Sequence, residues 1–247
     1  MKKKKRVDII VHERYPQYSR RQIQSWIMQG KVTVEGKVVT KAGTPISPDL
    51  EIKLDIQEPK YVSRAGFKLE KALDYFNIDV SGLVALDAGI STGGFTDCLL
   101  KYGAKRVYGI DVGYGQVHEK IFSDDRVVIV ERTNLRNVEA VLQTVGQKVD
   151  IVTLDLSFIS LLKVMDTVEA VLKDDGLLIT LIKPQFEAER KEVGRGGIIK
   201  DEKVHQKVLD TVITSIKSHG FSLIGWIESP LLGSAGNKEF LAYFKRS

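Results

Sequence analysis

The feature that most constrains this chain of 247 residues is a repeated alternation of short apolar runs and helical segments. The apolar runs are 84–86, 106–110, 127–130, 150–154, 177–182 and 222–227. Before the last run, apolar side chains between Val204 and Ile216 recur at helical spacing, and Gly220 follows as a helix stop. Short buried strands that alternate with helices form parallel sheets covered on both faces. The sequence therefore predicts an α/β fold with a doubly wound, Rossmann-like sheet.

A seventh apolar run, 239–244, is joined to the sixth by a hairpin-like loop. Two strands joined by a hairpin run antiparallel, whereas strands joined through a helix run parallel. We therefore expect a mostly parallel sheet whose last strand is antiparallel.

The residues before this region predict a separate, small α+β domain at the N-terminus. Apolar residues at helical spacing indicate a first helix over 7–15. A second helix should begin after Ser19, which can form a capping box with Gln22, and should end at Gly30. Short strands are expected at 31–34, 37–40 and 51–54.

The two predicted domains are separated by a polar segment that contains Pro59, which is typical of a linker. We expect the small domain to cover 1–58, the linker 59–64 and the large domain 65–247.

Positive charge is concentrated in the first quarter of the chain. Residues 1–60 hold 13 lysines and arginines against 7 acidic residues, whereas residues 61–247 hold 24 against 25. A near-neutral large domain behind a basic small one indicates a catalytic unit with a module that binds a polyanion. The alternative is a solvated tail at Lys2–Lys5, and without these lysines the first 60 residues remain basic by two charges.

The small domain resembles an S4 domain, an RNA-binding module found in ribosomal protein S4 and in several RNA-modifying enzymes. The resemblance is carried by Ser19-Arg20-Arg21, by the apolar pair Ile23 and Ile27, and by 30–36. It implies that RNA phosphates contact Arg6, Arg20, Arg21 and Lys41. Arginine forks at a helix N-terminus are physically suited to phosphates. The alternative is a pair of solvated arginines on an exposed helix.

A glycine-rich turn follows the first strand of the large domain, at 87–95. A dinucleotide fingerprint would place glycine at 89, 91 and 94, but Ser91 replaces the middle glycine that gives a pyrophosphate its close approach. Asp111 ends the next strand and can accept hydrogen bonds from both hydroxyls of a ribose. A ligand with a ribose but no pyrophosphate fits both facts, and S-adenosylmethionine is the common one. The alternative is a tight strand-to-helix turn that binds nothing.

Polar residues also follow the strand ends at which an open α/β sheet gathers its reacting groups. Asp155 and Lys183 follow the fourth and fifth strands, and Glu239 begins the antiparallel seventh. Lys68 lies in a helix over 67–76, just before the first strand. Each of these residues alone is explained well as a solvated residue at the end of a strand. Two lysines and two carboxylates at the same edge of the sheet, however, indicate a reaction site.

With these residues in view, the region 61–247 resembles the FtsJ-like ribose 2′-O-methyltransferases, whose catalytic set is Lys-Asp-Lys-Glu in this order. With the S4-like domain in front, the whole chain resembles the TlyA family, ribosomal RNA cytidine-2′-O-methyltransferases often labelled hemolysins. The matching stretches are 63–69, 87–97, 111–116, 131–134, 155–158, 183–187 and 236–239. The resemblance implies the catalytic residues Lys68, Asp155, Lys183 and Glu239. The residues expected to bind S-adenosylmethionine are Asp87, Gly89, Ser91, Thr92, Gly93, Gly94, Phe95, Asp111 and Asn134.

The expected mechanism removes one proton from a ribose 2′-hydroxyl, because the methyl group of the cofactor is already activated. Lys183 is the candidate base. A lysine can accept a proton only in its neutral form, which partial burial and a neighbouring ammonium such as Lys68 favour. Asp155 and Glu239 should orient the lysines.

Three other functions remain open from the sequence: a nicotinamide-dependent oxidoreductase on the same fold, a membrane-lytic hemolysin, and an RNA-binding protein without catalysis. We expect no metal, because the four histidines show no ligand spacing. One cysteine, Cys98, and the absence of a long apolar stretch favour a cytoplasmic protein that does not enter the membrane. The expected partners are ribosomal RNA or ribosomal subunits, and no obligate protein partner is evident.

Overall fold

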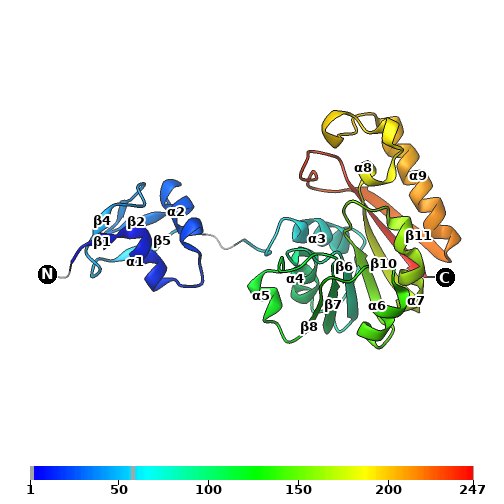
Figure 1. Ribbon diagram of the computed structural model, residues 1–247, viewed down its shortest axis with the longest axis horizontal. Coiled ribbons are helices and arrows are strands. Elements are labelled where there is room, and N and C mark those ends of the chain that lie inside the picture. Colours follow the sequence, from blue (N-terminus) through cyan, green and yellow to red (C-terminus); the bar gives the residue numbers. More distant parts are fainter. Residues whose placement is uncertain (1–2, 57–58, 247) are drawn as a thin grey trace. The chain divides into compact units, whose positions relative to one another are not determined.

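The computed structural model describes residues 3–56 and 59–246, and the chain forms two compact units that divide between Pro59 and Lys60 (Figure 1). The boundary expected at residue 58 lies outside the described residues. The linker expected over 59–64 is shorter in the structure. Tyr61 is only 1% exposed and packs into a core of the larger unit, and the Val62 amide donates to Asp97 Oδ2 at 2.8 Å. Residues 60–64 therefore belong to the larger unit.

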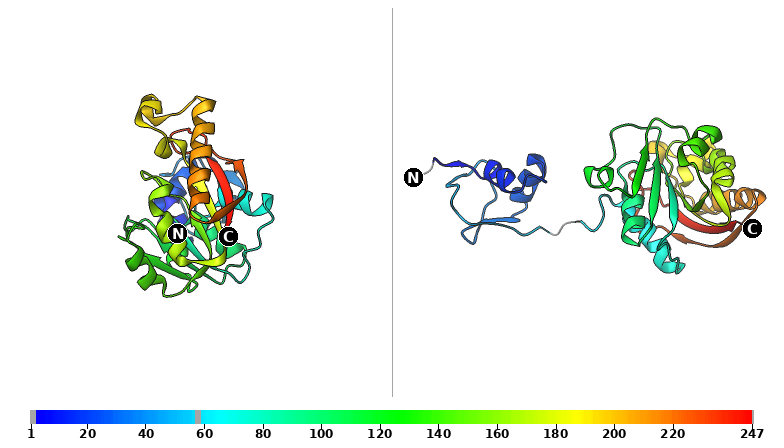
Figure 2. Two further views of the ribbon diagram at one scale, coloured as in Figure 1. Left: turned by 90° about the vertical axis from the view of Figure 1, so that its right-hand side faces the viewer. Right: turned by 90° about the horizontal axis from the view of Figure 1, so that it is seen from below.

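The smaller unit packs two helices against short strands (Figure 2). Its elements are β1 (Lys5–Arg6), α1 (Val7–Arg14), α2 (Arg20–Met28), β2 (Val32–Val34), β3 (Lys37–Val38), β4 (Pro45–Ile46) and β5 (Ile52–Leu54). The predicted capping box is confirmed: Ser19 Oγ accepts from the Gln22 amide at 3.3 Å, and Gln22 Oε1 accepts from the Ser19 amide at 2.9 Å. β2 lies between β3 and β5 in one antiparallel sheet, and β1 pairs with β4 in another.

The larger unit is built on a seven-stranded sheet with the order β11-β12-β10-β9-β6-β7-β8. The strands are β6 (Val84–Ala88), β7 (Arg106–Ile110), β8 (Val127–Val130), β9 (Val149–Leu154), β10 (Leu172–Ile182), β11 (Phe221–Glu228) and β12 (Phe240–Arg246). β12 runs antiparallel to both neighbours, and the pairs among β10, β9, β6, β7 and β8 are parallel. The predicted doubly wound sheet with an antiparallel last strand is confirmed. β10 begins earlier than expected, with a register shift between Leu172 and Leu177.

Helices cover both faces of this sheet (Figures 1 and 2). One apolar core contains residues of α3 (Ala65–Tyr75), α4 (Gly94–Lys101) and α5 (Glu119–Phe122). The other contains residues of α6 (Val138–Val145), α7 (Met165–Val171) and α9 (Glu202–Ser218). Shorter helical turns are η1 (Leu161–Val164), α8 (Pro184–Glu187), η2 (Arg190–Glu192) and η3 (Arg195–Gly197). The expected helix before β11 begins after its N-cap Asp201, whose side chain accepts from the Lys203 amide.

The register of the central strands gathers polar residues at one edge of the sheet. Thr180 of β10 lies opposite Leu154 of β9, and Ile182 lies opposite Phe240 of β12. Asp155, Lys183 and Glu239 each stand one residue beyond these pairs, at the carboxyl ends of the parallel strands. The topology thus brings together three residues that the sequence separates by up to 84 positions.

Candidate active site

The turn that follows β6 is held in a conformation that few side chains tolerate. Gly89 has φ +88°, and a Cβ atom there would lie 2.7 Å from the backbone oxygen of Asp155. Ser91 has φ +47°, also in the left-handed region. Because only glycine adopts such a backbone readily, Gly89 allows the turn to lie directly against the segment that carries Asp155.

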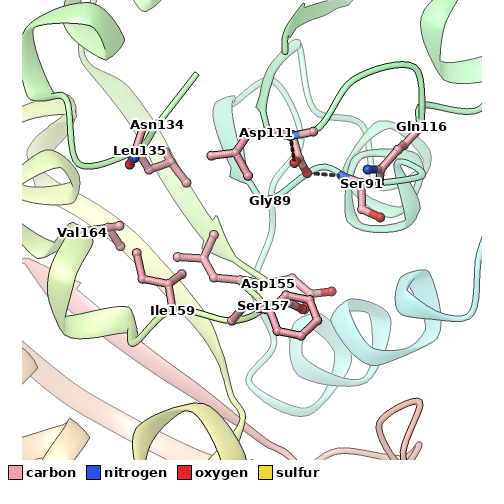
Figure 3. Close-up of a pocket in the computed structure, with 14 residues that line it drawn as sticks. Gly89, Ser91, Asp111, Gln116, Asn134, Leu135, Asp155, Ser157, Ile159 and Val164 are labelled. Atoms are coloured by element: carbon pink, nitrogen blue, oxygen red, sulfur yellow. Dashed lines mark hydrogen bonds between the residues drawn. The ribbon is translucent and has the colours of Figure 1, made fainter. Parts of the chain in front are cut away.

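Asp111 lies beside this turn, and backbone amides fix its carboxylate. Asp111 Oδ2 accepts from the Ser91 amide at 2.8 Å, and Oδ1 accepts from the Gly113 amide at 2.7 Å (Figure 3). Each carboxylate oxygen has a further lone pair. Asp111 can therefore still accept hydrogen bonds from two neighbouring hydroxyls of a ligand.

A cavity of about 330 Å³ opens between this turn and the segment after β9, a volume suited to a small-molecule ligand. Its lining residues are Gly89, Ser91, Asp111, Val112, Gly113, Gln116, Asn134, Leu135, Asp155, Leu156, Ser157, Phe158, Ile159 and Val164. Figure 3 shows Leu135, Ile159 and Val164 on the side of the cavity away from Ser91 and Gln116. These three apolar side chains share that side of the cavity with Asn134.

The structure brings four of the predicted cofactor residues to this cavity and leaves the other five outside its lining. Gly89, Ser91, Asp111 and Asn134 line it. The residues outside are Asp87, Thr92, Gly93, Gly94 and Phe95. Of these, Phe95 is 2% exposed and belongs to the core under α4. Gly94 faces the larger unit's first segment, where an added Cβ would meet Ser63 Oγ and Ala65.

Asp87 lies beneath the turn, and its side chain has no exposed surface. Its carboxylate accepts from Thr96 Oγ1 at 2.6 Å and from Thr153 Oγ1 at 3.0 Å, which joins β6 to α4 and β9. Burial raises the pKa of Asp87 to about 6, and the two threonine hydroxyls oppose the rise. Asp87 thus lies beneath the turn and not in the cavity lining, and its part in cofactor binding stays a prediction.

The four predicted catalytic residues form two ion pairs. Lys183 Nζ lies 2.7 Å from Asp155 Oδ1, and Lys68 Nζ lies 2.5 Å from Glu239 Oε2. Both lysines are 9% exposed and Glu239 is 3% exposed. Charges this far from water are stable only with such partners. Asp155 also lines the cavity, so one of the two pairs borders the ligand space.

Hydrogen bonds from two stretches that carry the family resemblance, 155–158 and 183–187, surround the Lys183–Asp155 pair, although the sequence analysis assigned no role to Ser157 or Glu187. Ser157 Oγ accepts from Lys183 Nζ at 2.9 Å. Glu187 accepts from Ser160 Oγ at 2.6 Å and from the Leu161 amide at 2.8 Å. These bonds join the segment after β9 to the segment after β10. Burial raises the pKa of Glu187, although its two donors act in the opposite direction.

Other residues of the cavity were also missing from the sequence prediction. Phe158 is 91% exposed, has φ +65° and contacts the ring of Phe186 at a centroid distance of 5.2 Å. Gln116 and Phe158 lie in stretches that carry the family resemblance, and Leu135 directly follows the predicted cofactor residue Asn134, so these positions were signals that could have indicated them. The apolar lining residues look like core residues in the sequence.

The four predicted RNA contacts all lie in the smaller unit and are all exposed. Arg6 and Arg20 share one partner, the buried carboxylate of Asp8, at 3.0 and 3.1 Å. Arg21 is the second residue of α2, and Lys41 follows the strand β3 by a few residues.

Comparison with known proteins relates the chain to RNA-modifying enzymes. The FtsJ-like methyltransferase family matches residues 61–246, and the S4 domain matches residues 5–52. Hemolysin A of Brachyspira hyodysenteriae is 42% identical over 97% of this chain and 99% of its own length. The 16S/23S rRNA (cytidine-2′-O)-methyltransferase TlyA of Mycobacterium tuberculosis is 37% identical over 99% of this chain and 91% of its own.

Solved structures match the fold of the chain. A Streptococcus thermophilus protein is 40% identical, with a TM-score of 0.74 over 99% of this chain and 89% of its own. The N-methyltransferase NodS of Bradyrhizobium japonicum, solved with S-adenosyl-L-homocysteine, is 16% identical, with a TM-score of 0.51 over 73% of this chain and 87% of its own. At that identity NodS shares the fold alone.

The match of residues 61–246 to a methyltransferase family, on a Rossmann-like sheet with a glycine turn and a carboxylate after β7, makes the larger unit a methyltransferase domain. The chain belongs to the FtsJ-like methyltransferase family, and it carries an S4 domain in front. Its relatives include both TlyA and hemolysin A. This membership favours methyl transfer over the nicotinamide-dependent alternative. In the described part of the chain, none of the helices has the length and apolarity needed to cross a membrane.

Proposed function

We propose that this chain transfers the methyl group of S-adenosylmethionine to a ribose 2′-hydroxyl of ribosomal RNA, with cytidine as the modified nucleoside. The observation that carries the proposal is the Lys183–Asp155 pair at the border of a cavity of suitable size, with Asp111 fixed at the same cavity. The Mycobacterium tuberculosis relative, a 16S/23S rRNA (cytidine-2′-O)-methyltransferase, supports the same substrate.

The residues of the cavity fit S-adenosylmethionine. Asp111 would accept hydrogen bonds from the ribose hydroxyls, because two backbone amides already hold its carboxylate in place. The apolar lining at Leu135, Ile159 and Val164 would take the adenine ring. When bound, the cofactor supplies a methyl group on a positively charged sulfur, and that methyl group needs no further activation.

The reaction then requires one proton to leave the ribose 2′-hydroxyl. Lys183 would accept this proton at Nζ once the ammonium of the Lys183–Asp155 pair has lost a proton to water. Asp155 and Ser157 would orient the amine, since both lie within 2.9 Å of Nζ. Lys68 and Glu239 would complete the tetrad by positioning the ribose, and their mutual ion pair keeps both side chains in place.

The smaller unit would bind the RNA through Arg6, Arg20, Arg21 and Lys41. Its match to the S4 domain and the excess of positive charge over 1–60 support this role. The larger unit would then carry the chemistry alone. A ribosomal RNA substrate and a single cysteine fit a cytoplasmic enzyme.

The proposal is tested by mapping 2′-O-methyl groups on ribosomal RNA after incubation with the protein and S-adenosylmethionine. Lys183→Ala should abolish transfer while cofactor and RNA still bind. Lys183→Arg should fail almost as completely, because a guanidinium keeps its charge and cannot deprotonate in a protein. The expected loss is about 10² to 10⁴ in single-turnover rate.

A matched control lies on β10, the strand that Lys183 directly follows. Lys173, near the other end of β10, forms an ion pair with Asp150 at 2.6 Å. Lys173→Arg should leave transfer unchanged. If Lys183→Arg kept a rate close to that of the native chain, Lys183 would act as a positive charge and not as a base. If no methylated ribose appeared with the native chain, the proposed function would be wrong.

A further inference from the structure

Asp8 is a charged residue inside the core of the smaller unit. It lies in the first turn of α1, has no exposed surface, and stands among the buried apolar residues Val7, Ile10 and Val11. A carboxylate excluded from water destabilises a fold unless hydrogen bonds compensate its charge. The presence of Asp8 at this position therefore requires partners, and those partners lie at the surface.

Three side chains donate to the Asp8 carboxylate. Arg6 donates from Nε to Oδ1 and from Nη2 to Oδ2, each at 3.0 Å. Arg20 donates from Nη2 to Oδ2 at 3.1 Å, and Gln24 donates to the same oxygen at 2.7 Å. Burial alone would raise the pKa of Asp8, but the hydrogen bonds from Arg6, Gln24 and Arg20 outweigh it and hold the pKa below its ordinary value. Asp8 is therefore ionised at neutral pH.

The two arginines come from different elements and keep donors available. Arg6 ends β1, and Arg20 begins α2. Their side chains are 50% and 49% exposed. A guanidinium has five N–H donors, and the bonds to Asp8 use two from Arg6 and one from Arg20. Two partly exposed guanidinium groups thus donate hydrogen bonds to one buried carboxylate. Together the three side chains carry one net positive charge.

We propose that Asp8 is a positioning residue that holds Arg6 and Arg20 in one arrangement, as a two-pronged site for a phosphate of the RNA backbone. The proposal rests on the RNA substrate proposed above. A free arginine loses rotamer freedom when it binds a phosphate, and arginines already fixed by Asp8 lose less. The planar forks also match the geometry of phosphate oxygens. Asp8 thus favours binding of an anion although it is itself an anion.

Asp8→Asn separates positioning from simple charge, because the two explanations predict opposite signs. Removal of one negative charge raises the positive charge of the unit, which by itself should strengthen RNA binding. Loss of positioning should instead weaken binding by about five- to tenfold, since two arginine side chains regain their freedom. The slope of log K against log salt should also become shallower by about one, as a phosphate contact is lost.

The probe is in vitro transcribed 16S and 23S rRNA, bound to the full chain at several salt concentrations. The matched control is Glu13→Gln, which removes one negative charge from the same helix. Glu13 is exposed and pairs with Lys5 at 2.8 Å, so its loss leaves the Asp8 cluster intact. We expect unchanged or slightly stronger RNA binding from this control.

A second variant covers the case in which Asp8→Asn does not fold. Arg20→Lys keeps the charge and the carboxylate but removes the fork, and it should also weaken RNA binding. The fluorescence of Trp26, on α2 and in ring contact with Tyr18, reports folding of this unit in a Trp226→Phe background.

The proposal is overturned if a folded Asp8→Asn variant binds RNA as tightly as the native chain or more tightly. It is also overturned if Arg20→Lys keeps native affinity and salt slope. Failure of the proposed function gives a different result, because the native chain itself would then neither bind nor methylate the RNA.

Discussion

Replacing Asp87 by asparagine should remove a pH dependence from the stability of the larger unit. Asp87 is completely buried beneath the glycine turn. The hydroxyls of Thr96 and Thr153 donate hydrogen bonds to its carboxylate, and neither of these partners carries a positive charge. Burial raises its pKa from 3.8 to about 6 in the folded chain. Asparagine has nearly the same shape and carries no charge at any pH.

The sign of this pH dependence follows from whether the folded or the unfolded chain binds the proton of Asp87 more tightly. Between pH 3.8 and about 6, the unfolded chain has released a proton that folded Asp87 keeps. The free energy of unfolding therefore falls as the pH rises through this window. The contribution is fully present below pH 3.8 and is lost above about 6. A shift of about two pKa units corresponds to roughly 3 kcal/mol.

The assay is urea unfolding of the full chain at a series of pH values, in a Trp26→Phe background. The sequence holds two tryptophans, so Trp226 on β11 then reports the larger unit alone. Other carboxylates titrate in the same range, so the measured quantity is the difference in free energy of unfolding between native Asp87 and Asp87→Asn. This difference should fall by roughly 2 to 2.5 kcal/mol between pH 4 and pH 7.

The reasoning is refuted if the two stability curves run parallel across this range. Parallel curves would mean that Asp87 releases its proton at the same pH in the folded and unfolded chains. A difference that rises with pH would also contradict it, because the folded chain would then stabilise the carboxylate.

Two further predictions concern the cavity. Gly89→Ala should lower the free energy of unfolding by roughly 1–2 kcal/mol, because the residue has φ +88°. Its Cβ would also displace the Asp155 backbone oxygen, so single-turnover methyl transfer should fall at least about tenfold, and a native rate would contradict the assigned role of Asp155. Asp111→Ala should weaken S-adenosylmethionine binding by about 10- to 100-fold in calorimetry. RNA affinity should not change, and unchanged cofactor affinity would remove Asp111 from the site.

Local signals in the sequence predicted most of the fold. The seven strands are bounded by turns and are rich in apolar residues, so their positions could be recognised without tertiary information. The capping box of Ser19 and Gln22 is likewise a property of four consecutive residues. In contrast, the two-residue strands β1 and β4 are too short to show alternation, and their pairing was not foreseen.

The remainder of the site depends on contacts between distant residues. The polar segment around Pro59 looks like a linker, but Tyr61 finds a buried position against α3 and α4. Asp87 looks like a cofactor ligand because it adjoins the glycine turn, yet its side chain points into the interior. The pairing of Arg6 and Arg20 through Asp8 has no sequence signature, because it joins three elements in space.

The position of β12 inside the sheet has a consequence for biosynthesis. β12 lies between β11 and β10, so an interior position of the sheet is filled by a strand that is synthesised after both of its neighbours. Glu239 immediately precedes this strand, and its partner Lys68 is 171 positions earlier. A nascent chain that has exposed Lys68, Asp155 and Lys183 still lacks the fourth member of the tetrad. Assembly of the predicted tetrad is therefore a late event in synthesis, because a growing chain cannot complete it before Glu239 has been made.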